Sequence, residues 1–190
     1  MKALEEKILR EGKVLPGHVL KVGSFLNQQI DVDFMMEMGQ EAARLFADEK
    51  VSKVLTVESS GIAVAVCVGA ALHAPVLFGK KHQSSNISGE VYSTMIHSYT
   101  HNTDYTVVVP AEFLNKGDRV LLVDDFLANG KALEGLMELC RQAGAEVVGA
   151  CCAIEKGFQH GGDTLREKGV RVESLAVIET MDDTSITFRK

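Results

Sequence analysis

The sequence has no tryptophan, only three prolines, and no apolar run long enough to cross a membrane. A membrane-spanning helix needs about 20 consecutive, mostly apolar residues, so we expect no membrane partner. The opening stretch, Met1 to Ile8, mixes charged and apolar residues and does not have the pattern of a signal peptide. Low-complexity tracts and internal repeats are also missing. These absences predict a cytoplasmic protein.

Cysteine is scarce, and its spacing excludes the common metal-binding motifs. The four cysteines, Cys67, Cys140, Cys151 and Cys152, form no C-x-x-C pair and lie in apolar surroundings. Such thiols are usually buried and structural. We therefore expect no disulfide and no cysteine-built metal site.

Excess positive charge is absent as well. The net charge is -6, from 20 basic and 26 acidic residues, which does not favour a nucleic-acid-binding surface. The chain has 190 residues, of which 46% are hydrophobic. That is enough for one domain with a sizeable core, and we expect residues 1–190 to form it.

The most informative stretch runs from Asp118 to Ala132. Val120 to Val123 is a short run of valine and leucine, which is typical of a strand buried in a parallel sheet. Asp124 and Asp125 follow at once, and a small polar turn then leads into a helix pattern. The apolar face of that helix comprises Leu133, Leu136, Met137 and Cys140.

This arrangement indicates a ligand site. Open α/β sheets bind ligands at the carboxyl ends of their strands, and a helix N-terminus suits a phosphate. The carboxylates of Asp124 and Asp125 suit ribose hydroxyls and would repel the phosphate itself. The alternative is that the pair only caps a turn.

A second strand, loop and helix repeat this pattern upstream. Val54 to Val57 predicts a buried strand, and Glu58-Ser59-Ser60-Gly61 leads into a helix over Ala63 to Leu72. Gly61 allows a ligand to approach the backbone amides closely, so the loop suits a second phosphate. After a third strand, Pro75 to Phe78, Lys80 and Lys81 could neutralise pyrophosphate, with an ordinary solvated loop as the alternative.

The rest of the chain completes an α/β pattern with a central, mostly parallel sheet flanked by helices. The predicted helices are Met1 to Glu11, Asp31 or Asp33 to about Asp48, and Gly161 to Gly169. The predicted strands are Val147 to Ile154, an edge strand over Val170 to Ile178, and a hairpin with arms Val91 to Tyr99 and Tyr105 to Val109. His97 and His101 are expected to be surface or turn residues of that hairpin.

The stretch from Asp118 to Ala132 resembles the ribose-phosphate signature of the type I phosphoribosyltransferases. Nearly end to end, the chain resembles the xanthine phosphoribosyltransferases of bacterial purine salvage. The resemblance implies that Asp124 and Asp125 hold the ribose hydroxyls of phosphoribosyl pyrophosphate during catalysis. Asn129 stands where that family usually has Thr, and Lys131 where it usually has Gly. The residues that would wrap the 5-phosphate are Ala128, Asn129, Gly130, Lys131 and Ala132.

The upstream loop resembles the family's pyrophosphate loop. Its residues are Glu58, Ser59, Ser60 and Gly61, with Ser60 where adenine-type members have Arg. The family often has a cis peptide bond at the start of this loop, here expected at Glu58-Ser59 or Ser59-Ser60.

The resemblance also divides the chain into parts. Residues 1–30 would form an N-terminal helix and a hood over the purine base, and 31–190 the core, with a flexible loop and hairpin over 79–106. For the base we predict apolar contact from Leu20, a hydrogen bond from Asn27, and donation from Lys156 to the 6-oxo group. Adenine carries an amino group there, so Lys156 favours oxopurines. Alternatively, Lys156 is an ordinary exposed lysine.

The predicted function is transfer of a phosphoribosyl group from phosphoribosyl pyrophosphate to xanthine, with release of pyrophosphate. Mg²⁺ would travel with the substrate, with no protein-built metal site and no organic cofactor. The resemblance implies a homodimer. One alternative is a guanine or hypoxanthine phosphoribosyltransferase. The other is a purine regulator that senses phosphoribosyl pyrophosphate. Such regulators carry a DNA-binding domain, and little chain precedes the Pro16-Gly17 turn, so we consider this weaker.

Overall fold

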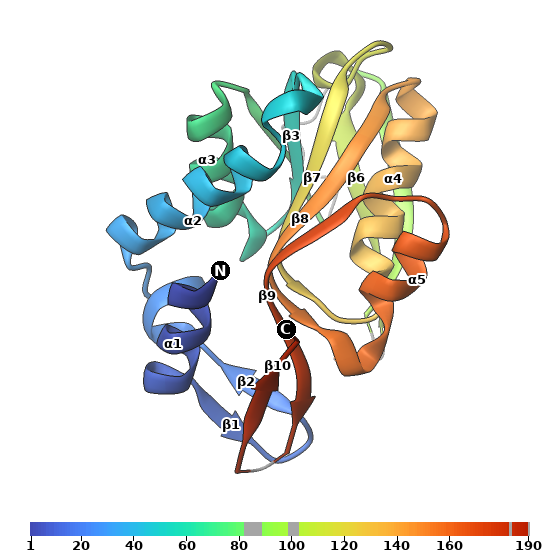
Figure 1. Cartoon of the computed structure of the whole chain (residues 1–190). Helices are drawn as coiled ribbons and strands as arrows, with labels where there is room; N and C mark the ends of the chain where they lie inside the picture. The colour runs from blue at the N-terminus through green and yellow to red at the C-terminus, as the bar shows by residue number, and fades with distance from the viewer. Residues whose placement is uncertain (82–88, 99–102, 183, 190) are drawn as a thin grey trace.

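A twisted sheet of strand order β10-β9-β8-β7-β3-β4 forms the centre of the computed structural model, which describes residues 1–81, 89–98, 103–182 and 184–189 (Figure 1). The neighbouring strands from β9 to β4 are parallel, and β10 is antiparallel to β9. The predicted mostly parallel sheet is therefore confirmed. Its strands are β3 (Lys53–Val57), β4 (Val76–Gly79), β7 (Arg119–Leu127), β8 (Glu146–Lys156), β9 (Val172–Met181) and β10 (Ile186–Phe188).

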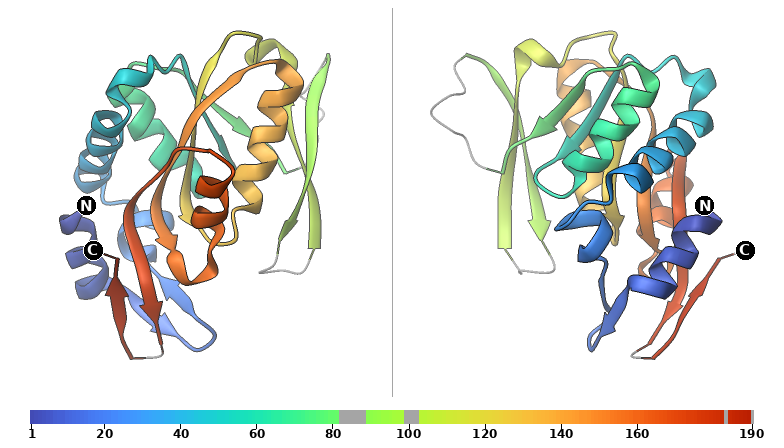
Figure 2. Two further views of the ribbon diagram at one scale, coloured as in Figure 1. Left: turned by 45° about the vertical axis from the view of Figure 1, so that its right-hand side comes forward. Right: turned by 90° about the vertical axis from the view of Figure 1, so that its left-hand side faces the viewer.

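Helices cover both faces of this sheet (Figures 1 and 2). On one face lie α1 (Lys2–Glu11), α2 (Val32–Leu45) and α3 (Gly61–Leu72). On the other lie α4 (Lys131–Ala143) and the short α5 (Gly161–Glu167). Short 3₁₀ turns occupy Ala47–Glu49, Ala111–Phe113 and Gly157–Gln159. No helix in the described part of the chain is long and apolar enough to cross a membrane.

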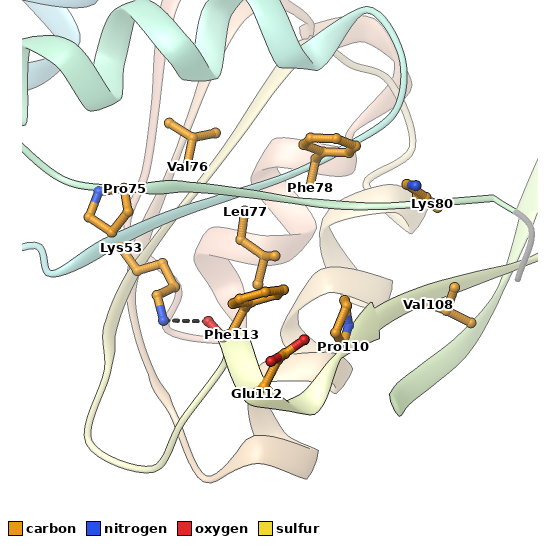
Figure 3. Close-up of a pocket in the computed structure, with 10 residues that line it drawn as sticks. All are labelled: Lys53, Pro75, Val76, Leu77, Phe78, Lys80, Val108, Pro110, Glu112 and Phe113. Atoms are coloured by element: carbon orange, nitrogen blue, oxygen red, sulfur yellow. Dashed lines mark hydrogen bonds between the residues drawn. The ribbon is translucent and has the colours of Figure 1, made fainter. Parts of the chain in front are cut away.

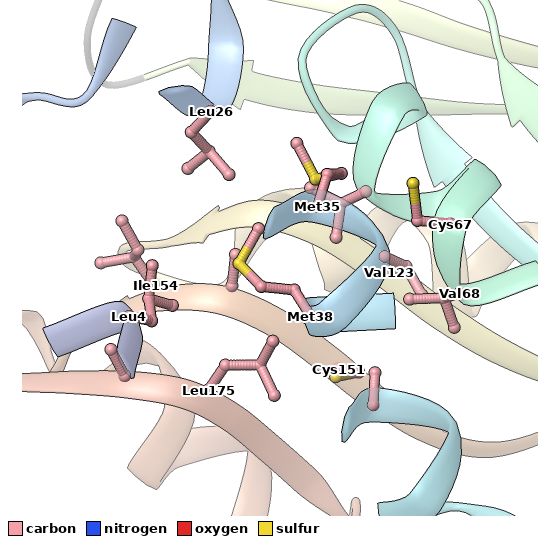
Figure 4. Close-up of a cluster of buried hydrophobic side chains, with 14 of the residues drawn as sticks. Leu4, Leu26, Met35, Met38, Cys67, Val68, Val123, Cys151, Ile154 and Leu175 are labelled. Atoms are coloured by element: carbon pink, nitrogen blue, oxygen red, sulfur yellow. The ribbon is translucent and has the colours of Figure 1, made fainter. Parts of the chain in front are cut away.

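The core is divided in two because neighbouring residues of a strand point to opposite faces of the sheet. In β7, Leu121 and Val123 join the cluster under α1, α2 and α3, whereas Leu122 joins the cluster under α4. Figure 4 shows Met35 and Met38 of α2 inside the first cluster, so the methionine stripe is core, as its spacing predicts. The four cysteines are buried and free.

The N-terminal segment forms a separate corner of the molecule, next to β10 (Figure 1). It contains a small antiparallel pair, β1 (Lys13–Leu15) and β2 (Val19–Lys21), and then a π-helical turn over Gly23–Asn27. Pro16 and Gly17 lie in the turn between the two strands. The π-helical turn places Asn27 at its carboxyl end.

The predicted hairpin is present. Its arms are β5 (Val91–Ser98) and β6 (Thr103–Pro110), and they pair antiparallel along their length. The hairpin packs on α4 so closely that a Cβ at Gly135 would lie 2.4 Å from Ile96 Cδ1. The proposed flexible loop falls partly on residues 82–88 and 99–102, including His101, which lie outside the described residues.

Several predicted boundaries are wrong, for tertiary or local reasons. Strand β7 continues past Val123, through the two aspartates, because the long strand β8 pairs with it as far as Leu127. The strand predicted as an edge is β9, which lies between β8 and β10. The chain turns back into β10 because Asp182 Oδ1 accepts hydrogen bonds from the backbone N–H groups of Thr184 and Ser185, each at 2.8 Å.

The predicted helix ends also shift. Helix α2 starts after Asp31, whose side chain accepts a hydrogen bond from Phe34 N–H at 3.2 Å, and it ends at Leu45. The chain then tightens into a 3₁₀ turn over Ala47–Glu49. Helix α5 ends at Glu167, and Gly169 takes a left-handed conformation after it. Helix termini commonly tighten or reverse in this way because their last carbonyls lack partners within the helix.

Candidate active site

Two adjacent carboxylates near the carboxyl end of β7 form the centre of the site. The side chains of Asp124 and Asp125 are nearly enclosed, with residue exposures of 7% and 6%. Asp125 Oδ2 accepts a hydrogen bond from Asn27 Nδ2 at 3.1 Å, and Asp125 Oδ1 accepts one from Ser60 Oγ at 3.0 Å. The strand thus joins the N-terminal segment and the loop before α3 in one place. Three predicted site residues meet there: Asn27 lies 98 positions and Ser60 lies 65 positions before Asp125 in the sequence.

Asp124 has a different environment from its neighbour. Its Oδ1 accepts a hydrogen bond from the Asp125 N–H at 2.9 Å. Burial, followed by the charge of Asp125, raises the pKa of Asp124 well above its usual range, while the charge of Lys81 acts in the opposite direction. A buried carboxylate beside a like charge is stabilised when positive charge appears next to it. Asp124 is therefore placed to favour a positively charged group beside it.

Gly61 and Thr56 explain how α3 comes so close to the aspartates. A Cβ at Gly61 would lie 2.4 Å from Thr56 Oγ1 and 3.0 Å from Asp124 Oδ1, so only glycine fits there. Thr56 Oγ1 is buried, and among the described residues it has no hydrogen-bond partner. Sequence reasoning missed Thr56, because a threonine inside a β-branched strand reads as ordinary strand sequence.

The predicted pyrophosphate loop connects β3 to the N-terminus of α3. The peptide bond between Glu58 and Ser59 is cis, at one of the two positions expected. Glu58 Oε1 accepts a hydrogen bond from the Lys81 N–H at 2.6 Å, which joins this loop to the chain leaving β4. Because Glu58 is used in that way, the anion-binding groups that the loop offers are backbone amides at a helix N-terminus.

The predicted 5-phosphate loop lies between β7 and α4. Gly130 has a left-handed conformation, with φ +82°, and Asn129 Oδ1 accepts a hydrogen bond from the Lys131 N–H at 3.1 Å. Helix α4 begins at Lys131, so Ala132 already lies inside its first turn. The Lys131 ammonium pairs with Glu134 Oε2 at 2.7 Å. A cation beside the phosphate stays a prediction for this residue.

The structure separates the two lysines that the sequence analysis treated together. Lys80 pairs through its backbone with Val108 of β6 and lines a cavity of 570 Å³ between β4 and the Pro110–Phe113 segment (Figure 3). The Lys81 ammonium lies 5.0 Å from the centre of the Tyr105 ring. Burial, followed by the charge of Asp124, raises the pKa of Tyr105, and the charge of Lys81 acts on the pKa of Asp124, so Lys81 and Tyr105 both lie within electrostatic range of that carboxylate. The Lys80 side chain instead lines the cavity of Figure 3.

Lys156, predicted to contact the base, is the last residue of β8. Its ammonium donates a hydrogen bond to the His18 carbonyl at 3.0 Å and lies 5.9 Å from the centre of the Phe126 ring. Burial lowers the pKa of Lys156. The His18 ring lies 5.7 Å from the Phe158 ring. The sequence analysis did not predict His18 as a contact of Lys156. The position of His18 directly after Pro16-Gly17 could have indicated a turn residue with an exposed carbonyl.

Leu20, predicted to contact the base, is 7% exposed, as is Asp124. The Leu20 side chain belongs to the buried core cluster, and a Cβ at Gly12 would lie 3.3 Å from Leu20 Cδ1. Apolar contact between Leu20 and a base remains a prediction. No metal-binding group of three or more His, Cys, Asp or Glu side chains occurs among the residues that the structure describes.

Comparison with known proteins identifies the family. Residues 26–182 match the family described as the phosphoribosyl transferase domain. The chain belongs to the phosphoribosyltransferase family. A xanthine phosphoribosyltransferase from Bifidobacterium adolescentis is 51% identical to it over 192 residues, covering 100% of both chains. One from Ligilactobacillus salivarius is 50% identical over 188 residues, covering 99% of this chain and 98% of its own.

Solved structures confirm the fold of this phosphoribosyltransferase. The adenine phosphoribosyltransferase from Giardia lamblia, complexed with 9-deazaadenine, aligns with a TM-score of 0.78 and 22% identity, over 94% of this chain and 98% of its own. That from Thermoanaerobacter pseudethanolicus aligns with a TM-score of 0.74 and 18% identity, over 92% and 98%. The predicted type I phosphoribosyltransferase fold is confirmed. At these identities the comparison carries the fold alone.

Proposed function

We propose that this phosphoribosyltransferase transfers the phosphoribosyl group of phosphoribosyl pyrophosphate to a ring nitrogen of xanthine, giving xanthosine 5'-monophosphate and pyrophosphate. The observation that carries the proposal is identity of about one half with xanthine phosphoribosyltransferases along the whole chain. The arrangement of Asp124, Asp125 and Lys156 at the carboxyl ends of neighbouring strands supports it.

The reaction needs positioning and charge stabilisation more than a nucleophile. The bond between ribose C1' and the pyrophosphate oxygen breaks, a bond between the purine nitrogen and C1' forms, and the base releases a proton. Asp124 and Asp125 hold the ribose hydroxyls and favour positive charge on the sugar. The loop over residues 128–132 orients the 5-phosphate, and the loop over 58–61 orients the leaving pyrophosphate.

Mg²⁺ enters this proposal as part of the substrate complex. The carboxylate oxygens of Asp124 and Asp125 are hard ligands of the kind that Mg²⁺ accepts, and two of them suit an ion held mainly by substrate oxygens. When bound, the ion offsets the negative charge that builds on the leaving pyrophosphate. The chain's own residues position the ribose beside it.

Turnover with four bases tests the proposal directly. Pyrophosphate release is measured with phosphoribosyl pyrophosphate, Mg²⁺ and each of xanthine, guanine, hypoxanthine and adenine. We expect strong turnover with xanthine, weaker turnover with guanine and hypoxanthine, and none with adenine, because the Lys156 ammonium can donate to a 6-oxo group but not accept from a 6-amino group. Preference for guanine or hypoxanthine would instead indicate a guanine or hypoxanthine phosphoribosyltransferase. Binding of phosphoribosyl pyrophosphate without turnover of any base would indicate a purine regulator.

The two neighbouring lysines provide a matched pair of variants. We expect Lys81→Met to lower kcat/KM for phosphoribosyl pyrophosphate about tenfold, because its ammonium faces the site. The main-chain N–H of Lys81, which binds Glu58, is unchanged by this substitution. Lys80→Met should stay within about twofold of wild type, because its side chain lies at the other cavity. Steady-state kinetics at saturating xanthine measures both, and equal losses in the two variants would contradict the assignment.

We also propose that the enzyme is a cytoplasmic homodimer, as the family resemblance implies. Its exposed Phe78 and Phe113 lie at the cavity of Figure 3, which offers an apolar surface for a second copy. Sedimentation velocity measures the assembly state, and a monomer at micromolar concentration would argue against the dimer.

A further inference from the structure

An ion pair between the buried Glu155 and the partly exposed Arg166 lies next to both proposed substrate subsites. Glu155 is 1% exposed, precedes Lys156 in β8, and stands opposite Leu127, the last residue of β7. Arg166 of α5 donates two hydrogen bonds to it, Nη1 to Oε1 at 2.9 Å and Nη2 to Oε2 at 2.7 Å. Ser174 Oγ donates a third, to Oε2 at 2.6 Å. The carboxylate is therefore fully partnered, and its role is not to contact substrate.

The first turn of α5 packs between Glu155 and the proposed 5-phosphate loop. A Cβ at Gly162 would lie 2.1 Å from Glu155 Oε1. On the other side, the Gly161 N–H donates to the Ala128 carbonyl at 3.2 Å. A Cβ at Gly161 would lie 2.3 Å from that carbonyl oxygen and 2.6 Å from the nitrogen of Gly130. Two successive glycines thus let one backbone segment touch the ion pair and the loop at once.

We propose that the Glu155–Arg166 pair positions the 5-phosphate loop, acting through the backbone of Gly161. The inference rests on the proposed function, in which residues 128–132 bind the 5-phosphate. Bidentate pairing with a guanidinium fixes both the distance and the orientation of α5 relative to β8. The Gly161 N–H then fixes the Ala128 carbonyl by its hydrogen bond. The backbone N–H groups of the loop therefore stay oriented toward the position of the 5-phosphate.

An ion pair is not needed here for stability alone. Replacing a buried ion pair with apolar side chains of similar volume is often neutral or stabilising, because burying two charges costs solvation energy. What the pair adds is a geometry that apolar contacts do not define. Lys156 follows Glu155 directly, so the same anchor also restrains the end of β8.

The test combines two variants with one matched control. Arg166→Lys keeps the charge and removes the bidentate geometry, and Gly161→Ala displaces the loop without touching the ion pair. Arg189→Met is the control: Arg189 shares Asp163 with Arg166, at 2.9 Å and 3.2 Å, but its removal leaves the two hydrogen bonds from Arg166 to Glu155 in place. The readouts are the Kd of phosphoribosyl pyrophosphate by calorimetry, the KM values of both substrates, kcat, and the melting temperature.

For Arg166→Lys and Gly161→Ala we expect the Kd and KM of phosphoribosyl pyrophosphate to rise on the order of tenfold, with the KM of the base changed less than about twofold. Arg189→Met should bind like wild type. Unchanged Kd in both variants together with a lowered melting temperature would show a merely structural pair and overturn the inference alone. Failure of the wild-type enzyme to bind phosphoribosyl pyrophosphate would overturn the inference and the proposed function together.

Discussion

Asp124→Asn is expected to lower turnover by about a thousandfold while making the protein more stable. The loss follows from removing the negative charge that favours a cationic sugar in the transition state. The fold should survive, because Asn keeps an oxygen that can accept the Asp125 N–H. The gain in stability should be on the order of 1 kcal/mol, because the ionised Asp124 is buried beside a like charge.

The stability difference between Asp124→Asn and wild type should depend on pH. The pKa of Asp124 is raised in the folded state, so between its unfolded and folded pKa values the folded protein binds more protons than the unfolded one. Stability therefore falls as pH rises through that window. The advantage of Asp124→Asn over wild type should be present at pH 7, should shrink as the pH is lowered through that window, and should be lost below about 4, where the unfolded carboxyl is also protonated.

Asp125→Asn should show the same loss of turnover with the opposite effect on stability. Both oxygens of Asp125 accept hydrogen bonds, one from Asn27 and one from Ser60. An amide would turn its NH₂ group toward one of these donors, which costs about 1–3 kcal/mol. The control is Asp48→Asn, an exposed carboxylate outside the site. Calorimetric unfolding and pyrophosphate release measure these effects. Wild-type turnover in either aspartate variant would refute the role given to the pair.

Lys156→Met should raise the KM of xanthine about a hundredfold and leave the Kd of phosphoribosyl pyrophosphate nearly unchanged. The variant loses a charged donor to the 6-oxo group, and hydrogen bonds of that kind contribute about 1.5–3 kcal/mol. It also loses the bond to the His18 carbonyl, which holds the N-terminal segment over this end of β8. Lys2→Met, at an exposed lysine of α1, is the control.

A pH profile separates the charge of Lys156 from its packing. Burial lowers the pKa of Lys156, so its ammonium loses a proton at a lower pH than an exposed lysine would. The KM of xanthine should therefore rise on the alkaline side in the wild-type enzyme beyond any rise seen in Lys156→Met, since the titration of the base is common to both. Parallel profiles for the two proteins would show that the ammonium does not bind the base.

Local sequence determined the elements and their order. An apolar run such as Val120 to Val123, between Arg119 and Asp124, favours a buried strand because its side chains suit a pleated, buried surface. The strand, small loop and helix pattern occurs at residues 54–62 and again at 120–132, and both loops were found where expected. These local patterns predicted an α/β fold, and the resemblance of the two loops to known motifs predicted the type I phosphoribosyltransferase fold and the family.

Tertiary structure decided how those elements meet. The hydrogen bond between Asn27 and Asp125, the separation of Lys80 from Lys81, and the contact of Gly161 with Ala128 depend on segments far apart in the chain. Even the length of β7 depends on the extent of its partner β8. Local propensity contains no information about such pairs, because their energy exists only when the sheet and both helical layers have packed. The sequence by itself therefore determined which chemical groups this protein has, and packing decided which of them lie together.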